Sequence, residues 1–155
     1  MHLPFFEGPE LTLPGGFEPE PWSIRYAAYT DLAGRHATVK VFEEILADDV
    51  SHTVFHCWSG KDRTGLTAAM LLDLLGVHDD DICAEYERSM DWWLPRLGHD
   101  ELSEGEPDDG YRAVPAVITL TLDRLRDRYG TIEAMLLQSG MTADLPDRLR
   151  AALLE

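Results

Sequence analysis

The sequence predicts a single α/β domain over residues 1–155 that is rich in helices. Two observations support this fold class. Residues 50–56 have the pattern of a short strand, and the polar stretch HCWSGKDRTG (56–65) joins it to a helix over 63–75 that is apolar nearly all round. A helix of that kind is buried. The length of 155 residues suits one domain whose core folds without disulfide staples.

The first part of the chain, residues 1–35, is predicted to be an irregular arm because prolines and glycines interrupt it repeatedly. These are Pro4, Pro9, Pro14, Gly15, Gly16, Pro19 and Pro21. The helix-rich part is expected over 36–155. It starts with a helix from about His36, whose buried face carries Val39, Phe42 and Leu46. The strand at 50–56 follows this helix.

Further helices are predicted beyond the polar stretch. Gly76 is placed to end the helix over 63–75. Asp79–Asp81 can cap the next helix, which carries Ile82, Tyr86, Met90 and Trp93. A long helix is expected to run to about Tyr129 before Gly130, and two short ones occupy 131–138 and 143–154. The acidic segment 98–110 is expected to be a loop.

These assignments give five or six helices and one clear strand, with 2–6 as the other strand candidate. A buried strand needs neighbours because its backbone N–H and C=O groups must be paired. Two explanations remain open. Either the proline-rich arm contains strands that its pattern does not reveal, or the chain begins part-way into a larger domain.

The composition excludes several classes of protein. The chain has 13 Lys+Arg against 29 Asp+Glu, and this net charge of −16 disfavours nucleic acids and anionic membranes as partners. No apolar run approaches the ~20 residues of a transmembrane helix, and the first residues do not have the pattern of a signal peptide. Two cysteines, Cys57 and Cys83, form neither a disulfide framework nor paired zinc ligands. We therefore expect a soluble, cytoplasmic protein.

The stretch HCWSGKDRTG has the residues of an anion-binding loop. A loop that leads into a helix N-terminus turns backbone N–H groups inward and adds the positive end of the helix dipole. Gly60 permits the backbone conformation that such a nest requires, and Arg63 can hold two oxygens of a tetrahedral anion. The same field stabilises a thiolate at Cys57. The sequence thus predicts an anion-binding cup with an activated sulfur nucleophile at its base.

This stretch resembles the HCxxGKDRTG loop of the bacterial protein tyrosine/serine phosphatases, a branch of the cysteine phosphatases defined by Cys-x5-Arg. The resemblance covers about 36–155 and continues through the apolar helix, Leu75-Gly76-Val77, the acidic cap, Tyr86, Ser89 and Tyr129-Gly130. It implies a cysteine-phosphatase-like fold with a small parallel sheet covered by helices and a helix-rich C-terminal half. Part of the N-terminal sheet is expected to be missing, because members of this family carry further strands upstream. It also implies hydrolysis of phosphomonoesters without metal or cofactor. Phosphotyrosine, phosphoserine or phosphothreonine, and phosphoinositides all fit as substrates.

The resemblance implies a role for each matching position. Cys57 attacks phosphorus and forms a phosphocysteine intermediate, while Arg63 and the loop amides bind the equatorial oxygens. Thr64 hydrogen-bonds the thiolate and helps it leave in the second step. The other loop residues are expected to contact the substrate or support the site: His56 through the local field, Lys61 as positive charge at the rim, and Trp58, Ser59 and Gly60 along the loop.

The general acid is the least determined assignment. The sequence has no Trp-Pro-Asp triplet, the pattern that many cysteine phosphatases use on a separate loop, and Asp91-Trp92-Trp93 is expected to lie in a helix. In the branch that the loop resembles, the aspartate within the loop is the acid, and here that is Asp62. It lies beside Arg63, where it can protonate the leaving oxygen. Asp31 is the second choice.

Other interpretations of the loop fit the residues less well. A nucleotide-binding P-loop requires Ser or Thr after Gly-Lys, whereas Asp62 follows Gly60-Lys61. A rhodanese-like sulfur carrier has a loop that is one residue shorter and lacks the Lys-Asp-Arg run. A metal site at His52, His56 and Cys57 is disfavoured because adjacent strand residues point to opposite faces. Cys83 is expected to be a small apolar residue on a helix face.

Two hypotheses of function follow from this pattern. The first is a phosphatase acting on a phosphorylated protein or a small phosphomonoester. The second is a catalytically impaired or truncated phosphatase-like module that binds phosphorylated ligands. An exposed sheet edge left by missing strands would favour a homodimer in either case.

Overall fold

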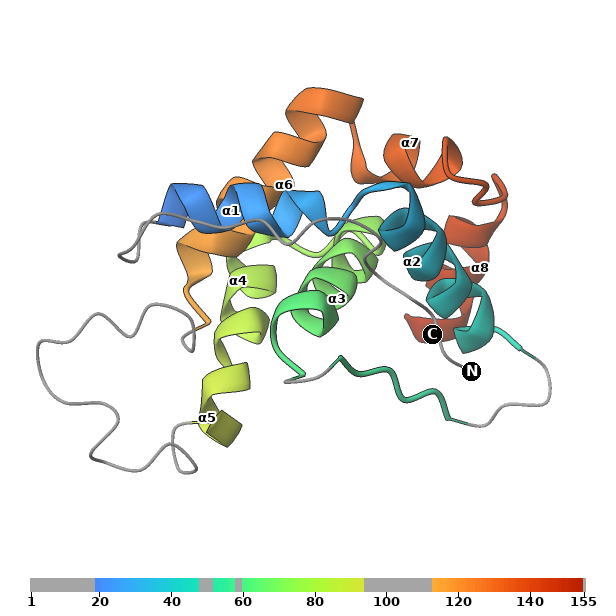
Figure 1. The fold of residues 1–155 in the computed structure, drawn as a ribbon. Coiled ribbons are helices and arrows are strands. Elements are labelled where there is room, and N and C mark those ends of the chain that lie inside the picture. Colours follow the sequence, from blue (N-terminus) through green and yellow to red (C-terminus); the bar gives the residue numbers. More distant parts are fainter. Residues whose placement is uncertain (1–18, 48–51, 58–59, 94–112, 155) are drawn as a thin grey trace, which may run out of the picture.

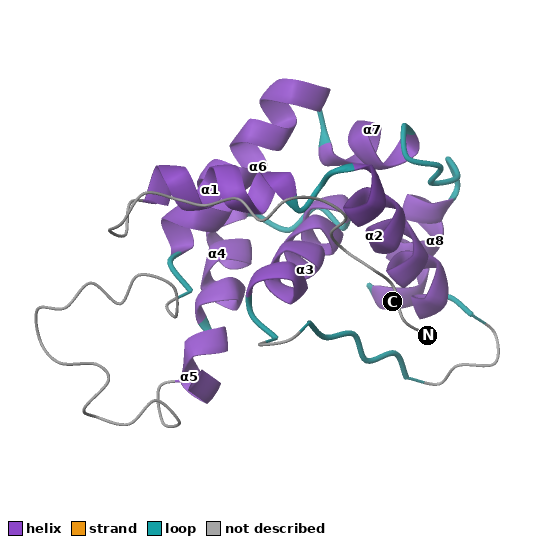
Figure 2. Cartoon of the chain, in the orientation of Figure 1, coloured by secondary structure: helices purple, strands orange, loops and turns teal. Residues whose placement is uncertain are grey.

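Helices make up most of the part of the chain that the structure describes. A computed structural model describes residues 19–47, 52–57, 60–93 and 113–154. Within these ranges the helices are α1 (Pro19–Ala28), α2 (Leu32–Ile45), α3 (Asp62–Leu74), α4 (Asp79–Glu87), α5 (Ser89–Trp93), α6 (Pro115–Tyr129), α7 (Ile132–Leu137) and α8 (Leu145–Leu153). Figure 2 shows these helices joined by loops, and no strand is assigned in the described residues.

The helix that follows the polar stretch, α3, lies in the middle of the molecule. It contacts α1, α4, α6 and α7, while α2 and α8 pack together on one side (Figure 1). The core consists of side chains that these helices bury completely: Phe42, Leu66, Met70, Ile118, Leu122, Met135, Leu136 and Leu149. The prediction that the helix beginning near 63 is buried is therefore confirmed.

The end of α3 shows how the sequence fixes the position of this helix. The N–H of Gly76 donates to the Asp73 carbonyl at 3.0 Å, and the N–H of Val77 donates to the Leu72 carbonyl at 3.0 Å. This pair of bonds is a Schellman motif. Its left-handed residue is Gly76, with φ of 82°, a conformation that glycine adopts without a Cβ clash. The predicted helix stop at Gly76 is confirmed.

The other predicted helices form close to their expected bounds. α2 begins at Leu32 rather than near His36 because Asp31 caps it, accepting a hydrogen bond from the Gly34 N–H at 2.9 Å. α6 has its proline, Pro115, in the first turn and ends before Gly130. Thr131 caps α7 through the Ala134 N–H at 2.9 Å.

The predicted irregular arm is wrong for part of its length. Residues 19–28 form α1, and α2 begins at Leu32, both inside the range 1–35. Pro19 and Pro21 lie in the first turn of α1, where backbone N–H groups have no partner within the helix, so the prolines do not disrupt it. Residues 1–18, including the candidate strand 2–6, lie outside the described residues.

The single helix expected after the acidic cap is divided in two. The Ser89 hydroxyl donates to the Tyr86 carbonyl at 2.5 Å, at the junction between α4 and α5. A serine that bonds a nearby carbonyl competes with the helical pattern, which explains the break. Ile82 and Tyr86 on α4 and Met90 on α5 are buried, as their periodicity predicted. The acidic segment 98–110 lies outside the described residues.

The predicted strand is not confirmed. Residues 52–57 run as a loop into the start of α3, and within the described residues they pair with no strand (Figure 2). Thr53 donates to the Glu44 carbonyl at 3.3 Å, and Phe55 packs against the core. Val54, in contrast, is 87% exposed. Partly buried and exposed side chains alternate along 52–57, but the described residues contain no sheet for this segment to join.

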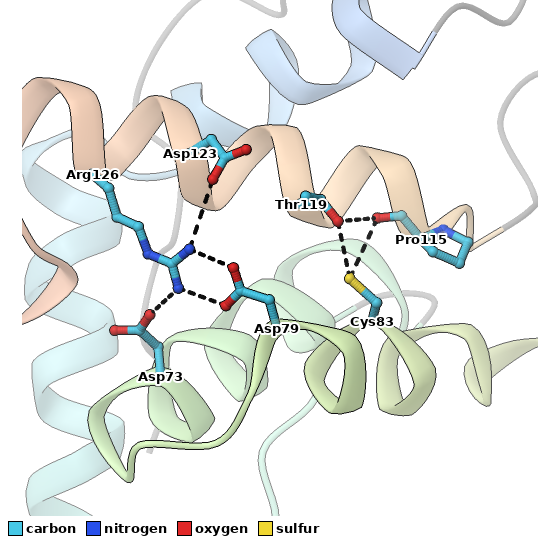
Figure 3. A network of polar contacts seen from close by, with 7 residues as sticks. All are labelled: Asp73, Asp79, Cys83, Pro115, Thr119, Asp123 and Arg126. Atoms are coloured by element: carbon cyan, nitrogen blue, oxygen red, sulfur yellow. Dashed lines mark hydrogen bonds and ion pairs between the residues drawn. The ribbon is translucent and has the colours of Figure 1, made fainter.

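A charged cluster ties three helices together (Figure 3). Arg126 of α6 contacts both carboxylate oxygens of Asp79 at 2.7 Å and also Asp73 Oδ1 at 2.5 Å. The hydrogen bond to Arg126 lowers the pKa of Asp79, and the Asp79 bond in turn raises the pKa of Arg126. Nearby, the Cys83 thiol lies 3.0 Å from the Thr119 hydroxyl, so it links α4 to α6. No helix among the described residues is long and apolar enough to cross a lipid bilayer.

Candidate functional site

The polar stretch brings a cysteine to the N-terminus of α3. The Cys57 N–H donates to the Thr64 hydroxyl oxygen at 2.9 Å, which closes the loop on itself. Gly60 has φ of 71°, in the left-handed region, so the chain can reverse between Cys57 and the helix. α3 starts at Asp62. The thiol therefore lies close to the backbone N–H groups and the positive dipole end of the first turn of α3.

This environment makes the Cys57 thiol more acidic than an ordinary cysteine. Burial is the largest single influence and raises the pKa. Hydrogen bonds from the side chain and backbone of Thr64 and from the backbone of Gly60, together with the charge of Arg63, outweigh burial. They lower the pKa of Cys57 from 9.0 to about 7. A substantial fraction of the thiol is therefore ionised at neutral pH, and the thiolate is the nucleophilic form.

The aspartate of the loop is held by two donors. Lys61 Nζ lies 2.5 Å from Asp62 Oδ1, and the Tyr26 hydroxyl donates to the same oxygen. Lys61 is only 4% exposed. The expectation that Lys61 projects positive charge at the rim does not match this placement, because its ammonium group is turned inward onto Asp62. A buried ammonium requires a partner of this kind.

Two tyrosines from separate helices meet beneath the loop. Tyr26 of α1 and Tyr86 of α4 place their hydroxyl oxygens 2.5 Å apart, and their rings meet edge to face with centroids 6.2 Å apart. Gly65 of α3 makes this approach possible. A Cβ at Gly65 would lie 2.6 Å from Tyr86 Cδ2, closer than real side-chain atoms approach. The absence of a side chain at Gly65 therefore allows Tyr86 to reach Tyr26.

The arginine of the loop lies beside the ring of Tyr29, the residue that directly follows α1. Arg63 Cζ is 5.9 Å from the ring centroid of Tyr29, within the range of a cation–π contact. The Tyr29 hydroxyl in turn accepts from Arg25 Nε at 3.2 Å. Because Arg63 is only partly buried, its guanidinium can still reach an anion held over the loop, while the ring restricts its orientation.

A cavity of about 410 Å³ lies next to the loop, between α3 and the α4–α5 pair. Its wall on the α3 side includes Gly60, Thr64 and Ala68, and the opposite wall includes Glu85 and Tyr86. The cavity thus joins Gly60 and Thr64 of the loop to α4, which carries Tyr86. Its volume is within the range of small-molecule sites.

The remaining predicted site residues have different placements. His56 is exposed, and its Nδ1 donates to the Cys57 carbonyl at 3.0 Å. Asp31, the second choice for the acid, is the cap of α2, and Asp91 lies in α5 as expected. Trp58 and Ser59 lie outside the described residues. Across the parts of the chain that the structure describes, no three His, Cys, Asp or Glu side chains could jointly hold a metal ion.

Sequence reasoning missed the contribution of α1. Tyr26 of α1 contacts Asp62, and Tyr29, directly after α1, contacts Arg63, so two neighbouring loop residues contact this segment. A signal was present, because Trp22, Tyr26 and Tyr29 are spaced four and three residues apart, as on one helix face. The surrounding prolines led to the prediction of an irregular arm instead.

Comparison with known proteins gives consistent matches. The model of the tyrosine phosphatase family matches residues 18–155. A tyrosine-protein phosphatase of Nostoc commune is 31% identical over 128 residues, which cover 74% of this chain and 43% of the relative. The triple specificity protein phosphatase PtpB of Mycobacterium tuberculosis is 31% identical over 120 residues, covering 64% of this chain and 42% of the relative. The chain therefore spans less than half the length of these relatives.

Proposed function

The chain belongs to the tyrosine phosphatase family, and we propose that it hydrolyses phosphomonoesters through a phosphocysteine intermediate on Cys57. The observation that carries this proposal is the lowered pKa of Cys57, at about 7, in a loop that leads into a helix N-terminus. Phosphotyrosine is the first candidate substrate, with phosphoserine, phosphothreonine and phosphoinositides as further candidates. The net charge of −16 favours a phosphorylated protein or small phosphomonoester over nucleic acid or an anionic membrane.

In the first step, the Cys57 thiolate attacks phosphorus, a sulfur–phosphorus bond forms and the phosphorus–oxygen bond to the leaving group breaks. Asp62 gives its proton to the leaving oxygen. Arg63 and the loop N–H groups hold the three equatorial oxygens throughout. In the second step, water attacks phosphorus, Asp62 takes a proton from it, and Cys57 leaves as a thiolate. Inorganic phosphate is released, and no metal or cofactor is required.

The loop residues that the structure describes have roles in this scheme that suit their placement. The Thr64 hydroxyl beside Cys57 stabilises the thiolate when it leaves. Gly60 contributes backbone N–H to the cup, and Lys61 acts on the substrate indirectly, through its ion pair with Asp62. His56 steadies the Cys57 carbonyl. Trp58 and Ser59, which lie outside the described residues, are proposed to contact the substrate. Because a reducing compartment keeps free thiols such as Cys57 and Cys83 reduced, we propose that the activity is cytoplasmic.

The test is hydrolysis of 4-nitrophenyl phosphate by the full chain. We expect activity in EDTA, inhibition by vanadate, and loss of activity in Cys57→Ser. Cys83→Ser is the matched control, because Cys83 is bonded to Thr119 on α6, and it should stay active. Full activity in Cys57→Ser would refute the mechanism.

A second experiment tests the acid. Asp62→Asn should reduce the hydrolysis of phenyl phosphate, which has a poor leaving group, far more than that of 4-nitrophenyl phosphate. General acid catalysis contributes about 10²–10⁴-fold where the leaving group needs a proton. Equal losses for the two esters would reject Asp62 as the acid.

A second candidate function is binding of phosphorylated ligands without turnover. Calorimetry that detects binding of a phosphate ester in the absence of hydrolysis would support it. We also propose that residues 52–57 pair in a small parallel sheet of a cysteine-phosphatase-like fold, and that an exposed edge at this segment favours a homodimer. Light scattering on the purified chain tests the homodimer.

A further inference from the structure

We propose that Tyr26 is a positioning residue for this reaction: its hydroxyl holds the Asp62 carboxyl in the orientation from which Asp62 protonates the leaving oxygen. The inference rests on the proposed function, in which Asp62 is the acid. Tyr26 would act through Asp62 and would not touch the substrate.

The geometry assigns different tasks to the two carboxyl oxygens of Asp62. The Tyr26 hydroxyl and Lys61 Nζ both donate to Oδ1, one from a distant position in the sequence and one from the adjacent position. Tyr26 comes from α1, and Lys61 directly precedes Asp62. Two donors on one oxygen fix the plane of the carboxyl group, because rotation about the Cβ–Cγ bond would break both bonds. Proton transfer to the substrate is then the task of Oδ2.

Tyr26 is itself held in place. Its single hydroxyl proton is donated to Asp62, so the proton between the two tyrosines must come from Tyr86. Tyr26 is 2% exposed and Tyr86 is 3% exposed. Burial is the main cause that raises the pKa of both hydroxyls, so both remain protonated donors at neutral pH. The hydrogen bonds therefore run from Tyr86 to Tyr26 and from Tyr26 to Asp62.

A structural role and a positioning role of the Tyr26 hydroxyl predict different effects of its removal on hydrolysis. If Tyr26 only supports the core, its loss lowers stability and affects all substrates by a similar factor. If Tyr26 orients the acid, its loss affects the step in which the leaving group needs a proton. The dependence of kcat/KM on the leaving group separates the two roles, because this parameter reports the steps up to the first irreversible one.

The experiment compares Tyr26→Phe with the wild-type chain on two esters. For phenyl phosphate we expect kcat/KM to fall by about tenfold or more, a part of the roughly 10²–10⁴-fold that an acid contributes. For 4-nitrophenyl phosphate we expect a fall of less than about threefold, because its leaving group departs without a proton. Tyr129→Phe removes the same atom from a ring on α6 that packs against Arg35 and Arg128, and it should change neither value.

The double variant gives a second, independent result. If Tyr26 acts through Asp62, adding Tyr26→Phe to Asp62→Asn should cause no further loss on phenyl phosphate. Losses that multiply, or equal losses on both esters in the single variant, overturn the proposal. If Tyr26→Phe does not fold, Tyr86→Phe replaces it. Tyr86→Phe removes the donor to Tyr26 and should give a smaller loss that is again confined to phenyl phosphate, and an equal loss on both esters overturns the proposal.

Failure of this inference can be distinguished from failure of the proposed function. Hydrolysis that persists in Cys57→Ser refutes the mechanism as a whole. Hydrolysis that is lost in Cys57→Ser and selectively impaired in Asp62→Asn, but uniformly affected in Tyr26→Phe, refutes only the positioning role. A uniform loss in Asp62→Asn rejects both the acid and the residue that positions it.

Discussion

Replacing Thr64 with valine should make the Cys57 thiol less acidic. The side-chain hydrogen bond from Thr64 is the strongest of the influences that lower the pKa of Cys57 from 9.0 to about 7. At pH 7, a thiol with a pKa near 7 is about half ionised, whereas one near 9 is only about 1% ionised. A hydrogen bond to a charged group contributes roughly 1.5–3 kcal/mol, and solvent screening at the partly exposed Cys57 reduces this. We therefore expect the pKa to rise by about one pH unit.

The assay is alkylation by iodoacetamide as a function of pH, in a Cys83→Ala background so that Cys57 is the only thiol. The rate follows the thiolate fraction, and the midpoint should lie near pH 7. Thr64→Val should shift it upward, and Thr64→Ser, which keeps the hydroxyl, should return it to near pH 7. A parent midpoint near 9, or no shift in Thr64→Val, would refute the assignment of the lowered pKa to this loop.

The same pKa makes stability depend on pH. The folded pKa of Cys57 is about 7, below its unfolded value near 9.0. Between these values, the unfolded chain holds a proton that the folded chain has released, so stability rises with pH. The contribution is fully present above about pH 9 and is lost as pH falls through about 7. Denaturant midpoints measured over this window should rise more steeply for the parent than for Cys57→Ser.

Two further changes test the packing around the site. Gly65→Ala should destabilise the fold by about 1–3 kcal/mol and lower activity, because its Cβ would lie 2.6 Å from the Tyr86 ring; an unchanged melting temperature would contradict this geometry. Arg126→Met should lower the free energy of unfolding by about 1–3 kcal/mol at pH 7. The loss should lie toward the low end of this range because water screens the charge of Asp79. Since the pKa of Asp79 is lowered in the fold, this deficit should shrink as pH falls below about 4. Arg148→Ala, on an exposed pair, is the control and should melt like the parent.

The helices around the loop could be predicted because their signals are local. The apolar residues of 63–75 and the glycine at 76 fix both the burial and the end of α3. Proline near the start of α6 and threonine before α7 act through the nearest turn of the chain. A cap, a stop and an apolar face all depend on residues within about one turn of each other, so the sequence pattern is sufficient to predict them.

The polar contacts of the site could not be predicted in the same way. Tyr26 and Asp62 are 36 positions apart, and Tyr26 and Tyr86 are 60 apart. No local pattern pairs hydroxyls over such distances, because the contact depends on how three helices pack. The prediction that Lys61 lies at the rim was wrong for a related reason. A lysine in a polar loop is normally exposed, and only the neighbouring Asp62 carboxylate, oriented by Tyr26, makes its burial favourable.

Helix α1, which lies in the range predicted to be an irregular arm, contributes directly to the site. Within the described residues, the loop supplies Cys57, Asp62 and Arg63. Tyr26 of α1 contacts Asp62, and Tyr29, which directly follows α1, contacts Arg63. The pKa of Cys57, the proposed nucleophile, depends mainly on Thr64 and the backbone of Gly60, and the charge of Arg63 is the smallest of the influences on it, so loss of α1 should leave that pKa near 7. Asp62, the proposed acid, contacts Tyr26 of α1, and Arg63 contacts Tyr29 at the end of α1, so a change to α1 should alter the orientation of both side chains. Changes to α1 should therefore impair proton transfer and phosphate binding while the reactivity of Cys57 toward iodoacetamide persists, a separation that a uniformly destabilised loop would not produce.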